Sequence, residues 1–264
     1  MTLRASHQST AITGLPVLRV VRHGDRHVVH DLTVDAQLQL DRHNPSAAPD
    51  PEAIARAILA LAAHHAAGEL EAFAATIGQH CLTHFADIEA ALVEVRSGRW
   101  DRLDLGGRPR DRDLVGPAGE LRVARFSSGG GSTRVAAGFR DMQLMTPATS
   151  ELQPLLLLRL DALWTYGWTE IPFDTQWQQV RRALTEAYTE RERLTGAHLA
   201  TALARAVLDE APAVREVEVR LEVARRHTID MTTFGIDNRG EVFGDLEMAR
   251  AVHVVVVQRE EIAE

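Results

Sequence analysis

The stretch that most constrains the fold is residues 31–40, where apolar and polar residues alternate without interruption. Its apolar members are Leu32, Val34, Ala36, Leu38 and Leu40. A period of two is that of a β-strand with one buried face and one face in water. Residues 17–23 form a second apolar stretch, and the intervening Gly24-Asp25 suits a tight turn. The sequence therefore predicts an antiparallel hairpin near its N-terminus.

The charged string RHGDRH at residues 22–27 also has a catalytic interpretation. Arg-His-Gly after an apolar strand resembles the signature of histidine phosphatases, where histidine is the nucleophile and arginines hold the phosphate. Those enzymes continue with a helix, whereas the alternation predicts a strand here, and their usual proline is replaced by His27. The alternation favours a solvated hairpin turn, with a phosphatase site as the alternative.

Two helices are predicted next. Asp50 suits an N-cap, Pro51 the first helical position and Glu52 the positively polarised first turn. Apolar residues at helical spacing continue to Gly68. A second helix then carries Leu70, Phe73, Ile77 and Cys81 on one face.

Pairs of histidines in this region raise the possibility of a metal site. His80 and His84 lie four residues apart, and His64-His65 precede them. No acidic or cysteine residue is spaced with them as in HExxH, so we expect surface histidines. The single cysteine, Cys81, shares the apolar stripe and is predicted to lie in the core.

The remaining elements give an α+β pattern of strand-strand-helix-helix-strand-strand, occurring twice. We expect residues 97–119 to form a long charged loop and Ser127–Ser132 a flexible connector. The other predicted elements are strands at 88–95 and 121–126, strands at 134–145 and 155–166, a helix capped by Asp174, a helix from Thr195 to Pro212, and strands at 216–223 and 251–257. Sequential strands with paired helices indicate antiparallel sheets with the helices packed on one face.

Composition limits the function classes. The net charge of −8 argues against nucleic-acid and anionic-membrane partners, which require clustered basic surface. No signal peptide or membrane-spanning run is present, so we expect a cytoplasmic protein. All 29 basic residues are arginine, which excludes chemistry that needs a lysine amine.

Five strings, in order along the chain, resemble the uricase (urate oxidase) family. They are RHGDRH followed by DLTVD, GRWDRLDLGGRP at 98–109, GFRD at 138–141, FDTQW at 173–177, and HTIDMTTFGIDNRGEVF at 227–243. The resemblance implies tandem tunnelling-fold (T-fold) units, which we place at residues 15–126 and 131–258. It also implies a homotetramer with active sites between subunits, and oxidation of urate by dioxygen without metal, flavin or other cofactor.

Several positions depart from what the resemblance implies for the family's active site. The family's lysine falls near residues 11–15, where this chain has none, and its threonine–acid pair aligns with Pro51-Glu52. The aromatic residue that stacks on the purine falls at Val135-Ala136. The arginine that grips the substrate falls at 152–154, where the nearest arginine is Arg159.

Two further positions complete the implied site. The glutamine anchor aligns with Ala197, beside His198, and only the histidine of an Asn-Lys-His triplet is retained, as His227 behind Arg225-Arg226. The resemblance thus assigns His227 and Glu52 to proton transfer, and Arg159, Arg225 and His198 to substrate binding.

Two functions remain open at the level of sequence. One is a uricase-like oxidase acting on urate or a related purine through a remodelled site. The other is an inactive homologue that serves as a purine-binding or structural subunit, either in a homotetramer or in a hetero-oligomer with a paralogue. Whether the chain is an enzyme is therefore undecided by the sequence.

Overall fold

The computed structural model describes residues 9–23, 26–40, 48–66, 68–104, 109–116, 119–146, 154–190, 196–244 and 250–259. Within these ranges the chain forms two compact units. The first comprises residues up to Gly138 together with Trp164–Gln178, and the second comprises Phe139–Leu163 and the residues from Gln179 onward. Strands β7 and β8 and helix α3 contribute residues to both units.

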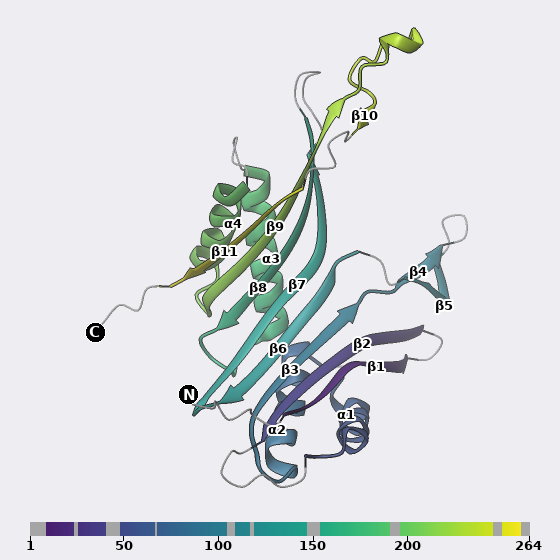
Figure 1. Ribbon diagram of the computed structural model, residues 1–264. Helices are drawn as coiled ribbons and strands as arrows, with labels where there is room; N and C mark the ends of the chain where they lie inside the picture. The colour runs from purple at the N-terminus through teal and green to yellow at the C-terminus, as the bar shows by residue number, and fades with distance from the viewer. Residues whose placement is uncertain are drawn as a thin grey trace, which may run out of the picture. The chain divides into compact units, whose positions relative to one another are not determined.

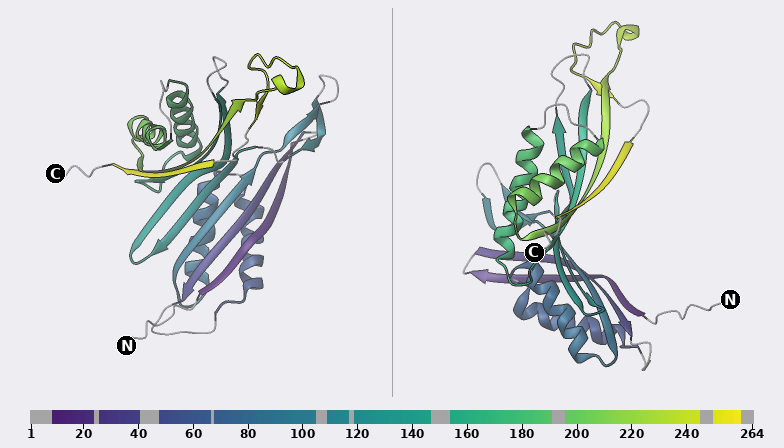
Figure 2. Two further views of the ribbon diagram at one scale, coloured as in Figure 1. Left: turned by 45° about the horizontal axis from the view of Figure 1, so that its top comes forward. Right: turned by 90° about the vertical axis from the view of Figure 1, so that its left-hand side faces the viewer.

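The first unit is an antiparallel sheet with two helices on one face (Figure 1). Its strands follow the order β1-β2-β3-β6-β7. They are β1 (Ser9–His23), β2 (Arg26–Leu40), β3 (Ile88–Gly98), β6 (Leu121–Gly129) and β7 (Ser132–Thr146). Helices α1 (Pro51–His65) and α2 (Leu70–His84) cover one face, as the turned views in Figure 2 show.

The RHGDRH string lies in a hairpin, as the alternation predicted. Strands β1 and β2 pair up to His23 opposite Arg26, which leaves a two-residue connection that lies outside the described residues. The strand that follows continues to Leu40, and its predicted apolar residues are buried. The helix that a phosphatase motif needs is not formed at residues 26–40.

The helical predictions in this unit are confirmed. The Asp50 side chain accepts a hydrogen bond from the Glu52 amide at 3.1 Å, and Pro51 is the first helical residue. The predicted stripe of α2 is buried, including Cys81. Because Gly78 lacks a side chain, α2 approaches Phe126 of β6 closely; a Cβ at Gly78 would lie 2.1 Å from that ring.

Three predictions in this unit are wrong. Ser127–Ser132 is the end of β6, a tight turn and the start of β7, because Gly130 and Gly131 both adopt the positive φ angles that such a turn needs. The supposed loop 97–119 contains the paired strands β4 (Asp101–Asp104) and β5 (Pro109–Val115). The first strand begins at Ser9 rather than at residue 17, because Ser9 pairs with Gln39 of β2.

The second unit has the strand order β7-β8-β9-β10, with β11 also paired to β9. These elements are β8 (Leu155–Tyr166), β9 (Val214–Thr228), β10 (Phe243–Gly244) and β11 (Arg250–Gln258), with helices α3 (Phe173–Glu190) and α4 (Gly196–Glu210) and the 3-10 turn η1 (Thr232–Phe234). The predicted alternation of β9 is confirmed, since Val217, Val219, Leu221 and Val223 are buried.

The start of α3 differs from its prediction. Asp174 is not a cap but the second residue of the helix, which begins at Phe173. Its carboxylate pairs with Arg122 instead of the helix amides. The predicted start of α4 at Thr195 lies outside the described residues, while its predicted end before Pro212 is confirmed.

Together these elements confirm an α+β fold of antiparallel strands and paired helices. Of the helices in the described ranges, none combines the length and apolar character needed to cross a bilayer. The domain limits 15–126 and 131–258 remain a prediction.

Candidate functional site

Glu52 lies in the first turn of α1 and is already paired. Its Oε1 accepts from Nη2 of Arg56 at 2.5 Å, one helical turn further on, and both side chains are largely exposed. Such an exposed pair contributes little to stability, and the carboxylate remains accessible to solvent. Glu52 belongs to the first unit, whereas the other four predicted site residues belong to the second.

Arg159 lies on β8 and forms an ion pair with Asp141 of β7. Asp141 has a positive φ of 64°, unusual for a residue with a side chain, and its amide donates to Oδ1 of Asp161 at 2.9 Å. The Asp141 carboxylate raises the pKa of the Arg159 guanidinium further above its ordinary value. Arg159 is therefore cationic and has a carboxylate partner within its own unit.

Arg225 and His227 are exposed residues near the end of β9, two positions apart and hence on the same face of the strand. They continue the row that begins with Val217 and is buried under the helices. His227 stands opposite Gly244 of β10. The structure thus brings these two predicted residues together on one face of one strand.

Arg159 lies on the opposite face of the sheet. It alternates with Leu158 and Leu160, which are buried on the helix-covered side. By the same alternation, Arg226 rather than Arg225 shares a face with Arg159. Within this chain, Arg159 and the Arg225–His227 pair therefore do not line one common cavity.

His198 lies in the first turn of α4, where its side chain is exposed. Nearby, a Cβ added at Gly196 would come within 3.0 Å of the His253 ring. The glycine that opens α4 therefore leaves room for a histidine from β11. The sequence alone gave no indication that Gly196 and His253 lie close together.

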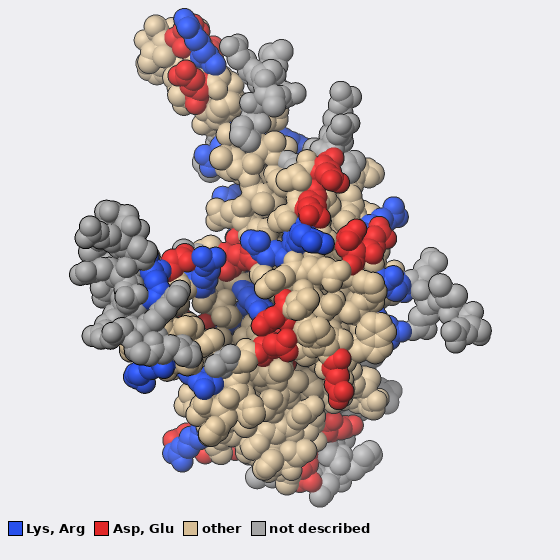
Figure 3. Space-filling model, turned by 180° about the vertical axis from the view of Figure 1, so that it is seen from behind, with Lys and Arg blue, Asp and Glu red and all other residues tan. Residues whose placement is uncertain are grey.

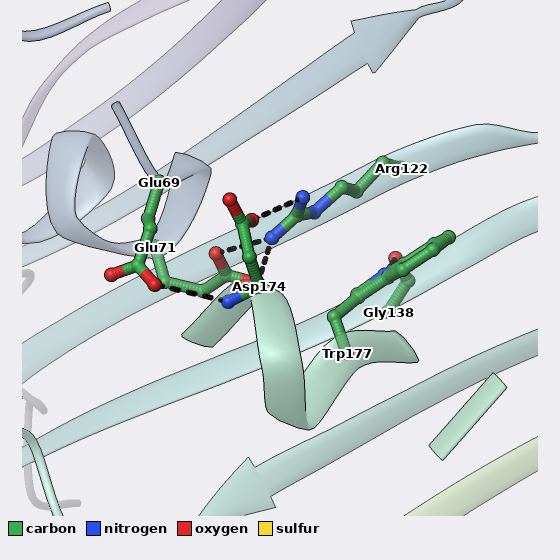
Figure 4. A network of polar contacts seen from close by, with 6 residues as sticks. All are labelled: Glu69, Glu71, Arg122, Gly138, Asp174 and Trp177. Carbon is green, nitrogen blue, oxygen red and sulfur yellow. Dashed lines mark hydrogen bonds and ion pairs between the residues drawn. The ribbon is translucent and has the colours of Figure 1, made fainter. Parts of the chain in front are cut away.

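A buried charged network in the first unit was not predicted. Arg122 of β6 donates to the fully buried carboxylate of Glu71 on α2 and forms an ion pair with Asp174 at 2.7 Å. Glu69 accepts from the Asp174 amide at 3.1 Å. Figure 4 shows the Arg122 guanidinium facing both carboxylates, which come from α2 and the first turn of α3.

One aromatic ring also contacts this network. The Arg122 guanidinium lies 5.0 Å from the centre of the Trp177 ring, within cation–π range. The Trp177 indole donates to the Gly138 carbonyl at 3.2 Å. The string FDTQW therefore supplies Asp174 as an anion and Trp177 as a ring to this network.

Burial shapes the acid–base behaviour of the network. Desolvation raises the pKa of Glu71, and the charge of Arg122 opposes that shift without cancelling it. Burial likewise raises the pKa of Tyr166 far above its ordinary value. These groups are enclosed within the unit, so we assign the network a structural role rather than a catalytic one.

The histidine pairs lie on α1 and α2. The His80 and His84 rings stack with centres 3.9 Å apart, and the described residues contain no group of three or more metal-ligating side chains. Cys81 is buried, and burial raises its thiol pKa to about 11.

Seen from behind, the surface interleaves basic and acidic side chains (Figure 3); the basic ones are all arginine, since the chain has no lysine.

A hollow with a cavity volume of about 550 Å³ lies in the first unit. Its walls come from β1, β2, β3 and the β6–β7 hairpin, and its one charged residue is Arg134. The sequence did not reveal it, because its lining is mostly serine, glutamine and alanine drawn from separate strands.

Comparisons with known proteins agree with the resemblance. The profile of the family described as Uricase matches residues 119–252, more than half of the chain. The uricase of Arthrobacter globiformis is 23% identical over 92% of this chain and 86% of its own length. The uricase of Danio rerio is 23% identical over 88% of this chain and 87% of its own length.

Solved structures show the same fold. The crystal structure of Arthrobacter globiformis uricase superposes with a TM-score of 0.85 at 21% identity, covering 100% of this chain and 98% of that one. A urate oxidase from Bacillus sp. TB-90 superposes with a TM-score of 0.76 at 14% identity, covering 96% and 100%. The tunnelling fold is thereby confirmed, and the match of the family profile shows that this chain belongs to the uricase family.

Proposed function

We propose that this chain is a uricase-family subunit that does not oxidise urate by itself and acts as a purine-binding or structural subunit. The observation that carries the proposal is that Arg159, the guanidinium expected to hold the substrate anion, is already paired with the carboxylate of Asp141. A substrate anion would have to compete with Asp141 for the guanidinium.

The chemistry of urate oxidation supports the same conclusion. Removing a proton from the purine and holding the resulting anion before dioxygen requires several positioned polar groups. This chain has no lysine, and Val135 and Ala136, at the place of the stacking aromatic, are buried apolar residues. Losing a single such group costs about 3 kcal/mol of transition-state stabilisation, and several are absent together.

A second candidate is a remodelled, cofactor-independent oxidase of urate or a related purine. The observation in its favour is the placement of Arg225 and His227 on one exposed face of β9. An imidazole two positions from a guanidinium can move a proton while the cation holds an anionic ring. In this alternative, Glu52 and His198 would approach from other subunits of a homotetramer or of a hetero-oligomer with a paralogue.

Oxygen uptake and the ultraviolet absorbance of urate together test the two candidates. We expect no turnover by the purified chain across urate and other oxopurines, with Arthrobacter globiformis uricase as the positive control. Saturable binding of urate in calorimetry without oxygen uptake would identify a purine-binding subunit. Oxygen uptake that disappears in His227→Ala but not in Arg205→Gln, a change on the exposed face of α4, would contradict the main proposal and establish the second.

A further inference from the structure

The hollow lies on the face of the first unit's sheet that the helices leave uncovered. Gln37, Leu92 and Ser127 are paired across β2, β3 and β6, so they form one row on a single face. Their neighbours along the strands, such as Val93 and Phe126, are buried. Phe126 is the residue that Gly78 of α2 meets, so the row containing Ser127 faces away from the helices.

Small residues create the depression. A Cβ at Gly129 would lie 2.7 Å from the Cβ of Ala90, closer than such atoms approach in proteins. The strands carrying Ala90 and Gly129 therefore meet without side chains that could fill the space above them. The resulting volume of about 550 Å³ falls within the range of roughly 300–1,000 Å³ that small-molecule sites occupy.

The lining combines one positive charge and several hydrogen-bonding groups with a larger apolar surface. Arg134 is its only charged residue, and Gln37, Gln39 and several serines supply amide and hydroxyl groups. Such groups both donate and accept hydrogen bonds, whereas the guanidinium donates to two oxygens of a carboxylate or a similar anion. The lining therefore suits a single negative charge on a polar molecule.

The adjacent row of charges does not neutralise Arg134. There Asp35 pairs with Arg96 at 2.6 Å, and Glu94 pairs with Arg125 at 2.7 Å. Each carboxylate of that row thus has its own arginine. In the part of the chain that the structure describes, Arg134 forms no ion pair with a carboxylate.

We propose that this hollow binds a small organic monoanion whose remaining surface carries hydrogen-bond donors and acceptors. Arg134 holds the charged group, while Gln37 and Gln39 contact the neutral polar edge. The site is separate from Arg159, Arg225 and His227, which belong to the second unit. The proposal does not rest on the proposed function, since the hollow would bind such an anion whether or not the chain oxidises a purine.

Calorimetric titration with three small ring compounds tests the proposal. Orotate carries one carboxylate and a hydrogen-bonding ring, uracil has the ring without the charge, and benzoate has the charge without the ring groups. We expect orotate to bind at least about tenfold more tightly than either of the other two, because uracil lacks the contact to the guanidinium and benzoate lacks the hydrogen bonds of the ring.

Variants locate the binding. Arg134→Gln should weaken orotate binding at least about tenfold, while Arg205→Gln, on the exposed face of α4, should leave it unchanged. Ala90→Leu should also weaken binding by filling the hollow, and it preserves the charge. Circular dichroism checks that each variant is folded.

Three results would overturn the proposal. They are no saturable orotate binding to the unmodified chain, equal binding of orotate and benzoate, and orotate binding that survives both Arg134→Gln and Ala90→Leu. Oxygen uptake with urate is measured separately, so a failure of the proposed function is recognised independently of these titrations.

Discussion

Nη2 of Arg122 lies 3.0 Å from Oε1 and 2.8 Å from Oε2 of Glu71, a carboxylate with no exposed surface. Removing one partner of a buried pair leaves an uncompensated charge, which destabilises proteins by about 3 kcal/mol or more. We expect Arg122→Gln to lower the free energy of unfolding by about that amount in urea denaturation. Arg56→Gln, which breaks the exposed Glu52–Arg56 pair, is the matched control and should cost less than about 0.5 kcal/mol. Equal effects of the two variants would contradict a structural role for the network.

Glu71 also makes stability depend on pH. Burial raises the pKa of Glu71 above its ordinary value of 4.5, so the folded state binds the proton more tightly than the unfolded state. Its contribution to stability is therefore fully present below that value and is lost as pH rises through the raised folded pKa. Glu71→Gln cannot titrate, so the stability of the native chain relative to this variant should fall as pH rises. If the stability of the native chain relative to Glu71→Gln stayed constant or increased with pH, a raised pKa of Glu71 would be contradicted.

The cap of α1 should be measurable on its own. Asp50 accepts from the Glu52 amide at 3.1 Å, which satisfies one of the unpaired amides of the first turn. Asp50→Ala should destabilise the fold by about 1 kcal/mol in urea denaturation, and Asp50→Ser should recover most of that loss. If alanine and serine behave alike, the hydrogen bond does not contribute.

Cys81 should react slowly with thiol reagents. Its thiol is buried on α2, and burial raises its pKa to about 11. At pH 8 roughly 0.1% of such a thiol is ionised, and only the thiolate reacts. We expect a chromogenic disulfide reagent to modify the folded chain at least about a hundredfold more slowly than the urea-unfolded chain. Rapid modification under native conditions would place the thiol outside the core.

Asn238 is expected to order the segment that follows β9. Its Nδ2 donates to the Ile229 and Val242 carbonyls, both at 2.8 Å, and its Oδ1 accepts from the Glu241 and Val242 amides. Asn238→Ala should reduce hydrogen-exchange protection of those two amides by about tenfold. Asn238→Asp keeps the acceptor but loses the donor, so it should have an intermediate effect. Unchanged protection in both variants would contradict this assignment.

The sequence predicted those elements whose signals are local. The alternation of β2 and β9, the Asp50-Pro51 start of α1 and the stripe on α2 each depend on neighbouring residues, and each is confirmed. The error at Asp174 arose because a distant partner decides the structure. Asp174 is a residue type that often caps helices. Its carboxylate instead forms an ion pair with Arg122, which lies 52 positions earlier in the chain.

The site was less predictable for the same reason. The alternation along β8 and β9 fixes which face of its own strand Arg159 or His227 occupies. That the two faces are opposite follows only once β8 and β9 are known to be neighbours in one sheet. Glu71 lies within a helix among alanines, and nothing nearby in the sequence marks it as buried. The hollow at Arg134 is built by five strands and has no contiguous motif.

The division of the chain has a consequence for its biosynthesis. The first unit is completed by residues Trp164–Gln178, which include Asp174 and Trp177 of the Arg122 network. A nascent chain released only as far as Gly138 lacks this closing segment, and Arg122 then has Glu71 but neither Asp174 nor Trp177. Domains commonly fold in N-to-C order as they leave the ribosome. Here the Arg122 network is completed only after about forty further residues have been synthesised.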